Sequence, residues 1–173
     1  MLTLLPFLIK LHESIERLNH RTNVYIKNPN EKHIHDVRTS VRRFNSTFLS
    51  LPKKYRTGPI LLSEYNEIAN KFFKVNSKIR DYDIIFDILN NYPQNSQRDL
   101  IIDSIKKDRQ LNLEKARTIA ISLKDLASSK VVDKINITEK ELQKRYNKVL
   151  SRLISKIELN FPIVITNALK IEE

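Results

Sequence analysis

Three side chains that can bind an anion recur at helical spacing between residues 33 and 44. His35, Arg38 and Arg42 lie within about 60° of one another on an α-helix, so they form one stripe. Guanidinium groups bind phosphate oxygens through paired hydrogen bonds, and a histidine beside an anion gains proton affinity. The stripe therefore suits a chain of negative groups. The same spacing would also suit arginines that pair with carboxylates across a helical bundle. Anion binding and structural ion pairing therefore both remain open interpretations.

A second cationic row occurs on the next predicted helix, at Lys71, Lys74 and Lys78. The row lies about 100° from the centre of an apolar face. That face consists of Tyr65, Ile68, Phe72, Val75 and Ile79. If the two helices pack through their apolar faces, the cationic rows can share one groove, where an anion would relieve their repulsion. The fourth predicted helix adds Lys106, Lys107, Arg109 and Arg117 in a less regular pattern.

Apolar residues at intervals of three and four predict six helical segments that position these rows. They cover residues 3–23, 31–51, 58–91, 95–127, 138–160 and the chain from 162 onward, with loops at 53–58 and 128–137. Thr138 and Glu141 form a capping box at the start of the fifth segment. The expected core face of the first segment is Leu4, Leu5, Leu8, Leu11, Ile15 and Leu18. That of the second is Ile34, Val37, Val41, Phe44 and Phe48.

Composition favours an all-α protein with an anionic partner. The 173 residues include one glycine, whereas hairpins and barrels use glycine at their turns. We expect a single domain over residues 1–173, a bundle of about five to six long antiparallel helices with a basic groove. A formal net charge of +11 favours nucleic acid, phosphate polymers or an anionic membrane as partner, unless the charge only serves solubility.

Other classes are excluded by what the sequence lacks. No cysteine is present, which excludes disulfides and thiolate metal sites. The N-terminal apolar stretch contains Pro6, is too short to span a membrane and lacks the basic start of a signal peptide. We therefore expect a cytoplasmic protein with no membrane association.

The acidic motif Arg80-Asp81-Tyr82-Asp83 could hold a metal or act as an acid–base pair. On a helix, however, the two carboxylates point about 160° apart. Structural ion pairs that position the cationic side chains are the favoured interpretation.

Two motifs together resemble the CHAD family (conserved histidine α-helical domain). His35-x-x-Arg38-x-x-x-Arg42-Arg43 follows a proline-containing turn, and Ile79-Arg80-Asp81-Tyr82-Asp83-Ile84 comes about forty residues later. The resemblance is best from about Leu4 to Leu89, and the order and separation of the motifs make it fairly specific. It implies a helical domain of two pseudo-symmetric halves around a basic channel, which binds inorganic polyphosphate without catalysis.

The resemblance assigns His35, Arg38, Arg42 and Arg43 to the family's basic helix, and Arg80, Asp81 and Asp83 to its second motif. Together with the helical pattern, it predicts polyphosphate binding, which sulfate or phosphate would mimic. The expected binding residues are His35, Arg38, Arg42, Arg43, Lys71, Lys74, Lys78, Arg80, Lys106 and Arg109, with Asp81 and Asp83 in structural ion pairs.

The chain also departs from the family pattern. Domains of the family resemble a doubled unit, with a second helix that carries His and Arg in the C-terminal half. Here all four histidines lie before residue 36, so there is no second His-x-x-Arg. Ser77 stands where the family often has glycine. We expect the chain to correspond to the N-terminal half to two-thirds of such a domain, incomplete at its C-terminus. Truncation, a naturally short member and closure by a homodimer would each account for this.

Three other functions remain as alternatives. A nucleic-acid-binding helical protein would share the phosphate contacts, but tryptophan is absent and most Phe and Tyr residues fall on core faces. A structural bundle with incidental charge predicts that the two cationic rows face solvent on different sides. An enzyme is disfavoured: the segment nearest to the Glu-x-Glu-x-Lys strand of triphosphate-tunnel hydrolases, residues 139–143, lacks the lysine and opens a helix. Glycine-rich phosphate loops are absent, and the histidine spacing suits no metal, so we expect no catalysis, cofactor or metal.

Overall fold

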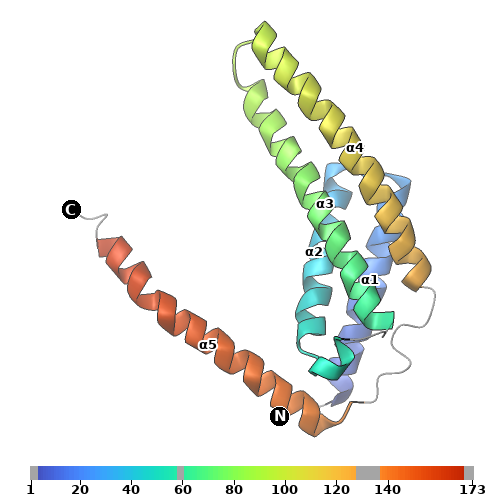
Figure 1. Cartoon of the computed structure of the whole chain (residues 1–173), viewed down its shortest axis with the longest axis vertical. Helices are drawn as coiled ribbons and strands as arrows, with labels where there is room; N and C mark the ends of the chain where they lie inside the picture. The colour runs from blue at the N-terminus through green and yellow to red at the C-terminus, as the bar shows by residue number, and fades with distance from the viewer. Residues whose placement is uncertain (1–3, 58–60, 128–136, 170–173) are drawn as a thin grey trace.

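The computed structural model describes residues 4–57, 61–127 and 137–169, and within these ranges the chain forms helices and no strand (Figure 1). The elements are α1 Leu4–Lys27, α2 Glu31–Leu49, the short 3-10 turn η1 Lys53–Tyr55, α3 Leu61–Asn90, α4 Ser96–Ala127 and α5 Glu139–Leu169. The predicted all-α class is confirmed.

Two helix boundaries differ from the prediction. α1 continues to Lys27 rather than ending near Asn23, because Tyr25 still contributes a buried ring to the core. The sixth helix predicted from Pro162 is not a separate element, since α5 runs through this position to Leu169. A proline removes one amide donor from a helix, and here the helix continues across it. The predicted start of the third helix at 58–60 and the loop at 128–136 lie outside the described residues.

Helices α1 to α4 form a bundle around one apolar core. α1 packs against α2 and α4, and α3 packs against the same two helices. The predicted core face of α2 is entirely buried, as are Tyr65, Phe72 and Ile79 on α3. Two edge-to-face ring contacts join the helices: Phe44 with Tyr65 at 5.2 Å and Tyr25 with Phe72 at 5.0 Å between centroids.

On α1, the predicted core face is wrong at one position. Leu11, Ile15 and Leu18 are buried, but the side chain of Leu5 is 68% exposed. Leu5 lies about 120° around the helix from Leu11, so it points away from the bundle. Phe7 takes the buried position near the helix start instead.

The helix starts follow from capping side chains. Asn30 Oδ1 accepts a hydrogen bond from the His33 amide at 2.9 Å and starts α2. At the start of α5, the Thr138 amide donates to Glu141 Oε2 at 3.2 Å and the Glu141 amide donates to Thr138 Oγ1 at 3.3 Å. The predicted capping box is confirmed.

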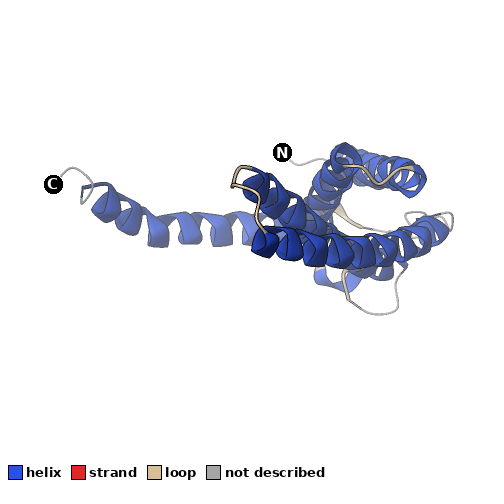
Figure 2. Ribbon diagram, turned by 90° about the horizontal axis from the view of Figure 1, so that it is seen from above, coloured by secondary structure: helices blue, strands red, loops and turns tan. Residues whose placement is uncertain are grey.

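Two parts of the chain project from the bundle. The distal part of the α3–α4 hairpin extends past the ends of α1 and α2, and α5 leaves the opposite end and stands clear of the other helices (Figures 1 and 2). None of the described helices is both long and apolar enough to cross a membrane.

Candidate anion-binding site

The antiparallel contact between α2 and α3 places two predicted arginines side by side. Asn45 on α2 donates a hydrogen bond from Nδ2 to Oδ1 of Asn70 on α3, at 2.8 Å. One turn further along, the guanidinium groups of Arg38 and Arg42 both lie over the ring of Phe73, at 5.7 and 5.4 Å from its centroid. The aromatic face attracts both cations, so one ring holds two positive charges together.

The arginine pair has no carboxylate within ion-pair distance in the part of the chain that the structure describes. Partial burial lowers the pKa of Arg38, the neighbouring charges of Arg42 and Arg80 lower it further, and Asp81 opposes them. Arg38 Nε is also buried and has no hydrogen-bond partner within the described chain. An anion placed here would meet two guanidinium groups with free donors.

The lysine row lies elsewhere on α3. Lys71 and Lys78 lie about 160° and 140° around the helix from Phe73, and both are exposed. The ammonium group of Lys71 pairs with Glu67 at 2.8 Å. Lys74, about 100° from Phe73, is the nearest of the three. The structure therefore does not bring the lysine row onto the arginine pair.

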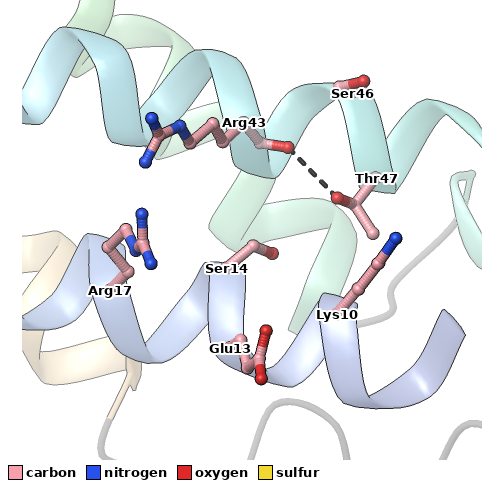
Figure 3. A pocket seen from close by; sticks show the side chains of 7 residues that line it. All are labelled: Lys10, Glu13, Ser14, Arg17, Arg43, Ser46 and Thr47. Atoms are coloured by element: carbon pink, nitrogen blue, oxygen red, sulfur yellow. Dashed lines mark hydrogen bonds between the residues drawn. The ribbon is translucent and has the colours of Figure 1, made fainter. Parts of the chain in front are cut away.

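The other predicted residues of α2 divide between two sides of the helix. His35 is exposed on the stripe of Arg38, with Nε2 at 3.4 Å from Thr39 Oγ1. Arg43 lies about 140° around α2 from Arg38 and faces α1 instead. Figure 3 shows its guanidinium directed toward Arg17 across a hollow of ≈ 440 Å³ between α1 and α2. This hollow is lined by Lys10, Glu13, Ser14, Arg17, Arg43, Ser46 and Thr47.

Besides Lys71, three predicted cations are paired with carboxylates. Arg109 Nε of α4 lies 2.7 Å from Asp83 Oδ1 of α3, and both side chains are largely buried. Arg80 pairs with Glu31 at the start of α2. Lys106 lies 3.8 Å from Asp103 on its own helix. Asp81 forms no such pair in the described chain, but its charge acts on Arg38.

A strongly basic hollow that the sequence analysis missed lies between η1 and α5. Its volume is ≈ 640 Å³, and it is lined by Pro52, Lys53, Arg56, Thr57, Glu141, Lys144, Arg145, Lys148 and Arg152. Six of these residues are cations, and the single carboxylate, Glu141, is already paired with Lys54 at 2.6 Å. Burial lowers the pKa of Arg145, and the charges of Arg56 and Arg152 lower it further. The recurrence of Lys144, Lys148 and Arg152 at intervals of four is the signal that could have predicted it.

This η1–α5 hollow lies at the end of the arginine stripe on α2. Leu49 is seven residues after Arg42, which places it on the same side of the helix and about 10 Å further along. The Leu49 carbonyl accepts hydrogen bonds from Arg145 Nε at 3.1 Å and Nη2 at 2.8 Å. The hollow with its six cations therefore lies at the C-terminal end of α2, the end that follows Arg42 in the chain.

No cluster of three metal-ligating side chains occurs in the part of the chain that the structure describes. Comparison of the chain with protein-family models, curated proteins and solved structures finds no match.

Proposed function

We propose that this protein is a cytoplasmic, non-enzymatic receptor for inorganic polyphosphate. The observation that carries the proposal is the arginine pair: Arg38 and Arg42 share the ring of Phe73 and have no carboxylate partner among the described residues. Holding two like charges together costs free energy that a bound anion recovers. The resemblance of the two sequence motifs to the CHAD family supports the same ligand.

A polymer of phosphate fits this surface better than a single phosphate ion. The arginine pair on α2 and the η1–α5 hollow at the C-terminal end of the same helix are separate cationic sites. A chain of linked negative groups can occupy both at once, so binding the first site raises the effective concentration at the second. A single phosphate gains no such advantage.

Nucleic acid is the second candidate because it offers the same phosphate charge. Base recognition by single-stranded binders depends on open aromatic faces. Phe73, the ring at this site, is half-buried and lies beneath two guanidinium groups. This arrangement favours a ligand without bases.

The proposal is tested by binding of long-chain polyphosphate to Arg38→Ala/Arg42→Ala. Each lost charged contact removes on the order of 1.5–3 kcal/mol, so we expect the double variant to bind at least about 100-fold more weakly. The matched control is Arg117→Ala/Lys124→Ala, which removes the same charge from exposed positions of α4. Equal affinity of the wild type and the arginine variant at physiological salt would refute the proposal.

Competition distinguishes the two polyanions. Labelled polyphosphate bound to the wild type is displaced by unlabelled polyphosphate, RNA or DNA at matched phosphate concentration over a salt series. We expect polyphosphate to compete most strongly at every salt concentration. Equal loss of binding in both double variants would instead indicate a non-specific effect of net charge, as expected for a bundle with incidental charge.

A further inference from the structure

Two groups of large apolar side chains are exposed on the described part of the chain. One is the hairpin tip, residues 81–105 at the distal end of α3 and α4. It exposes six large apolar side chains: Ile84, Ile85, Ile88, Tyr92, Leu100 and Ile101. The other is the apolar face of α5, five exposed side chains within an arc of about 100°: Tyr146, Leu150, Leu153, Ile154 and Ile157. Exposed large apolar side chains gathered on one element commonly mark an interaction site.

The two surfaces cannot cover each other within one molecule. The start of α5 is fixed to one end of the bundle: Glu139 Oε1 accepts from the Leu4 amide at 3.3 Å, and Arg145 donates to the Leu49 carbonyl. The hairpin tip is at the other end, since Arg80 already pairs with Glu31, the first residue of α2. α3 alone is about 45 Å long, and α5 projects away from the hairpin (Figure 1). The apolar face of α5 can therefore meet a hairpin tip only on another molecule.

The charges of the two surfaces are opposite. Residues 81–105 contain five aspartates and one arginine, although the full chain has a net charge of +11. Residues 142–157 of α5 contain five lysines or arginines and no acid. The five cations of α5 lie about 110° or more from the centre of its apolar face, so they flank a contact made through that face. Pairing α5 with a second α5 would leave the hairpin tip exposed. Pairing α5 with the tip covers both apolar surfaces and brings two segments of opposite net charge next to each other.

We propose that two copies of this chain form a symmetric dimer in which α5 of each packs on the hairpin tip of the other. The contacting lengths match: the apolar face of α5 spans about 17 Å, and α3 extends about 15 Å beyond Arg80. A two-fold pair makes this contact twice, and each contact buries one α5 face and one hairpin tip. A typical interface buries about 1,600 Å² in total, so each of the four surfaces needs to bury only about 400 Å². Apolar patches of this size are within the range of interaction sites.

The molar mass in solution tests the dimer. Light scattering after size exclusion should give twice the 20.4 kDa of one chain for the wild type. Leu153→Asp/Ile157→Asp on α5 and Ile84→Asp/Ile88→Asp on the tip should each be monomeric, with unchanged helical circular dichroism because all four positions are exposed. The control is Leu159→Asp: Leu159 is 73% exposed but lies about 180° around α5 from Leu150, so this variant should remain a dimer.

Mixing the two monomeric variants tests which surfaces meet. A mixed pair keeps one intact contact, between α5 of the tip variant and the tip of the α5 variant. We expect a dimer in the mixture, weaker than that of the wild type. A tip variant that dimerises alone would indicate pairing of α5 with α5 and overturn the proposal.

Two further outcomes would also overturn it. One is a wild-type chain that is monomeric throughout a concentration series up to about 100 µM, the range in which a stable interface persists. The other is a monomer whose α5 binds vesicles containing phosphatidylserine but not vesicles of phosphatidylcholine. The second result would identify α5 as a membrane-surface helix, since it also combines an apolar face with a cationic one.

Discussion

The guanidinium group of Arg42 lies 5.4 Å from the centroid of the Phe73 ring, on the neighbouring helix. This contact fixes a flexible charged side chain on an aromatic surface and keeps it beside Arg38, which uses the same ring. The geometry of the proposed site thus depends on a neutral residue as well as on its charges.

Replacing that ring should weaken polyphosphate binding without any change in net charge. We expect Phe73→Leu to lower the affinity by up to about five- to thirtyfold, since the ring makes two cation–π contacts that contribute roughly 0.5–1 kcal/mol each. Isothermal titration calorimetry with polyphosphate measures the effect. The control is Phe86→Leu, the same substitution further along α3. An affinity unaffected by Phe73→Leu would show that the ring does not position the pair.

Neighbouring positions on α2 should separate folding from binding. Val41 is fully buried, so Val41→Asp places an unpaired carboxylate in the core and should destabilise the protein by several kcal/mol. Arg42 is exposed and loses one cation–π contact, so Arg42→Ala should change the free energy of unfolding by less than about 1 kcal/mol. Urea denaturation followed by circular dichroism measures both. If Arg42→Ala destabilised the protein as much as Val41→Asp, its weaker binding would result from unfolding rather than from the lost guanidinium group.

The ion pair between Asp83 and Arg109 should contribute to stability rather than to binding. It joins α3 to α4, and removing one partner of a largely buried pair leaves the other charge unsatisfied. Because Arg109 remains partly in contact with solvent, we expect Asp83→Asn to cost only about 1–2 kcal/mol of unfolding free energy. A double-mutant cycle with Arg109→Gln isolates the pairwise term. The affinity for polyphosphate should remain at the wild-type value in Asp83→Asn. A marked loss of affinity would indicate that Arg109 contributes to binding.

The sequence predicted the parts of this structure that depend on local periodicity. Apolar spacing identified the buried face of α2, and the Thr138–Glu141 pattern identified the start of α5. Both follow from helical geometry within one segment. The spacing of His35, Arg38 and Arg42 likewise located the stripe on which the arginine pair lies.

Contacts between helices were not accessible in the same way. Phe73 was not distinguished from other apolar residues of α3, because its role comes from facing α2 in the antiparallel pair. The lysine row satisfies the same periodicity rule as the arginine stripe, yet the rotation of α3 turns Lys71 and Lys78 away from it. At the η1–α5 hollow, Arg145 donates to the Leu49 carbonyl 96 positions earlier in the chain, and no pattern within one segment relates the two residues.

The attachment of α5 to η1 should weaken in acid. The hydrogen bond from Lys54 lowers the pKa of Glu141 below its ordinary value of 4.5, and the backbone amide of Thr138 lowers it further. Because the folded-state pKa is depressed, the stabilising contribution is complete above the ordinary value and is lost as the pH falls through the lower, folded-state value. Carbon-detected NMR of the glutamate carboxyl groups should therefore find Glu141 titrating below pH 4.5, and Lys54→Ala should move its pKa upward. Glu67, whose pKa is lowered by Lys71 on the same helix, provides an internal reference that Lys54→Ala should leave unchanged. If the titration of Glu141 is the same with and without Lys54, the contact does not hold α5 against η1 in solution, and the hydrogen bonds of Arg145 to the Leu49 carbonyl would have to hold the hollow together.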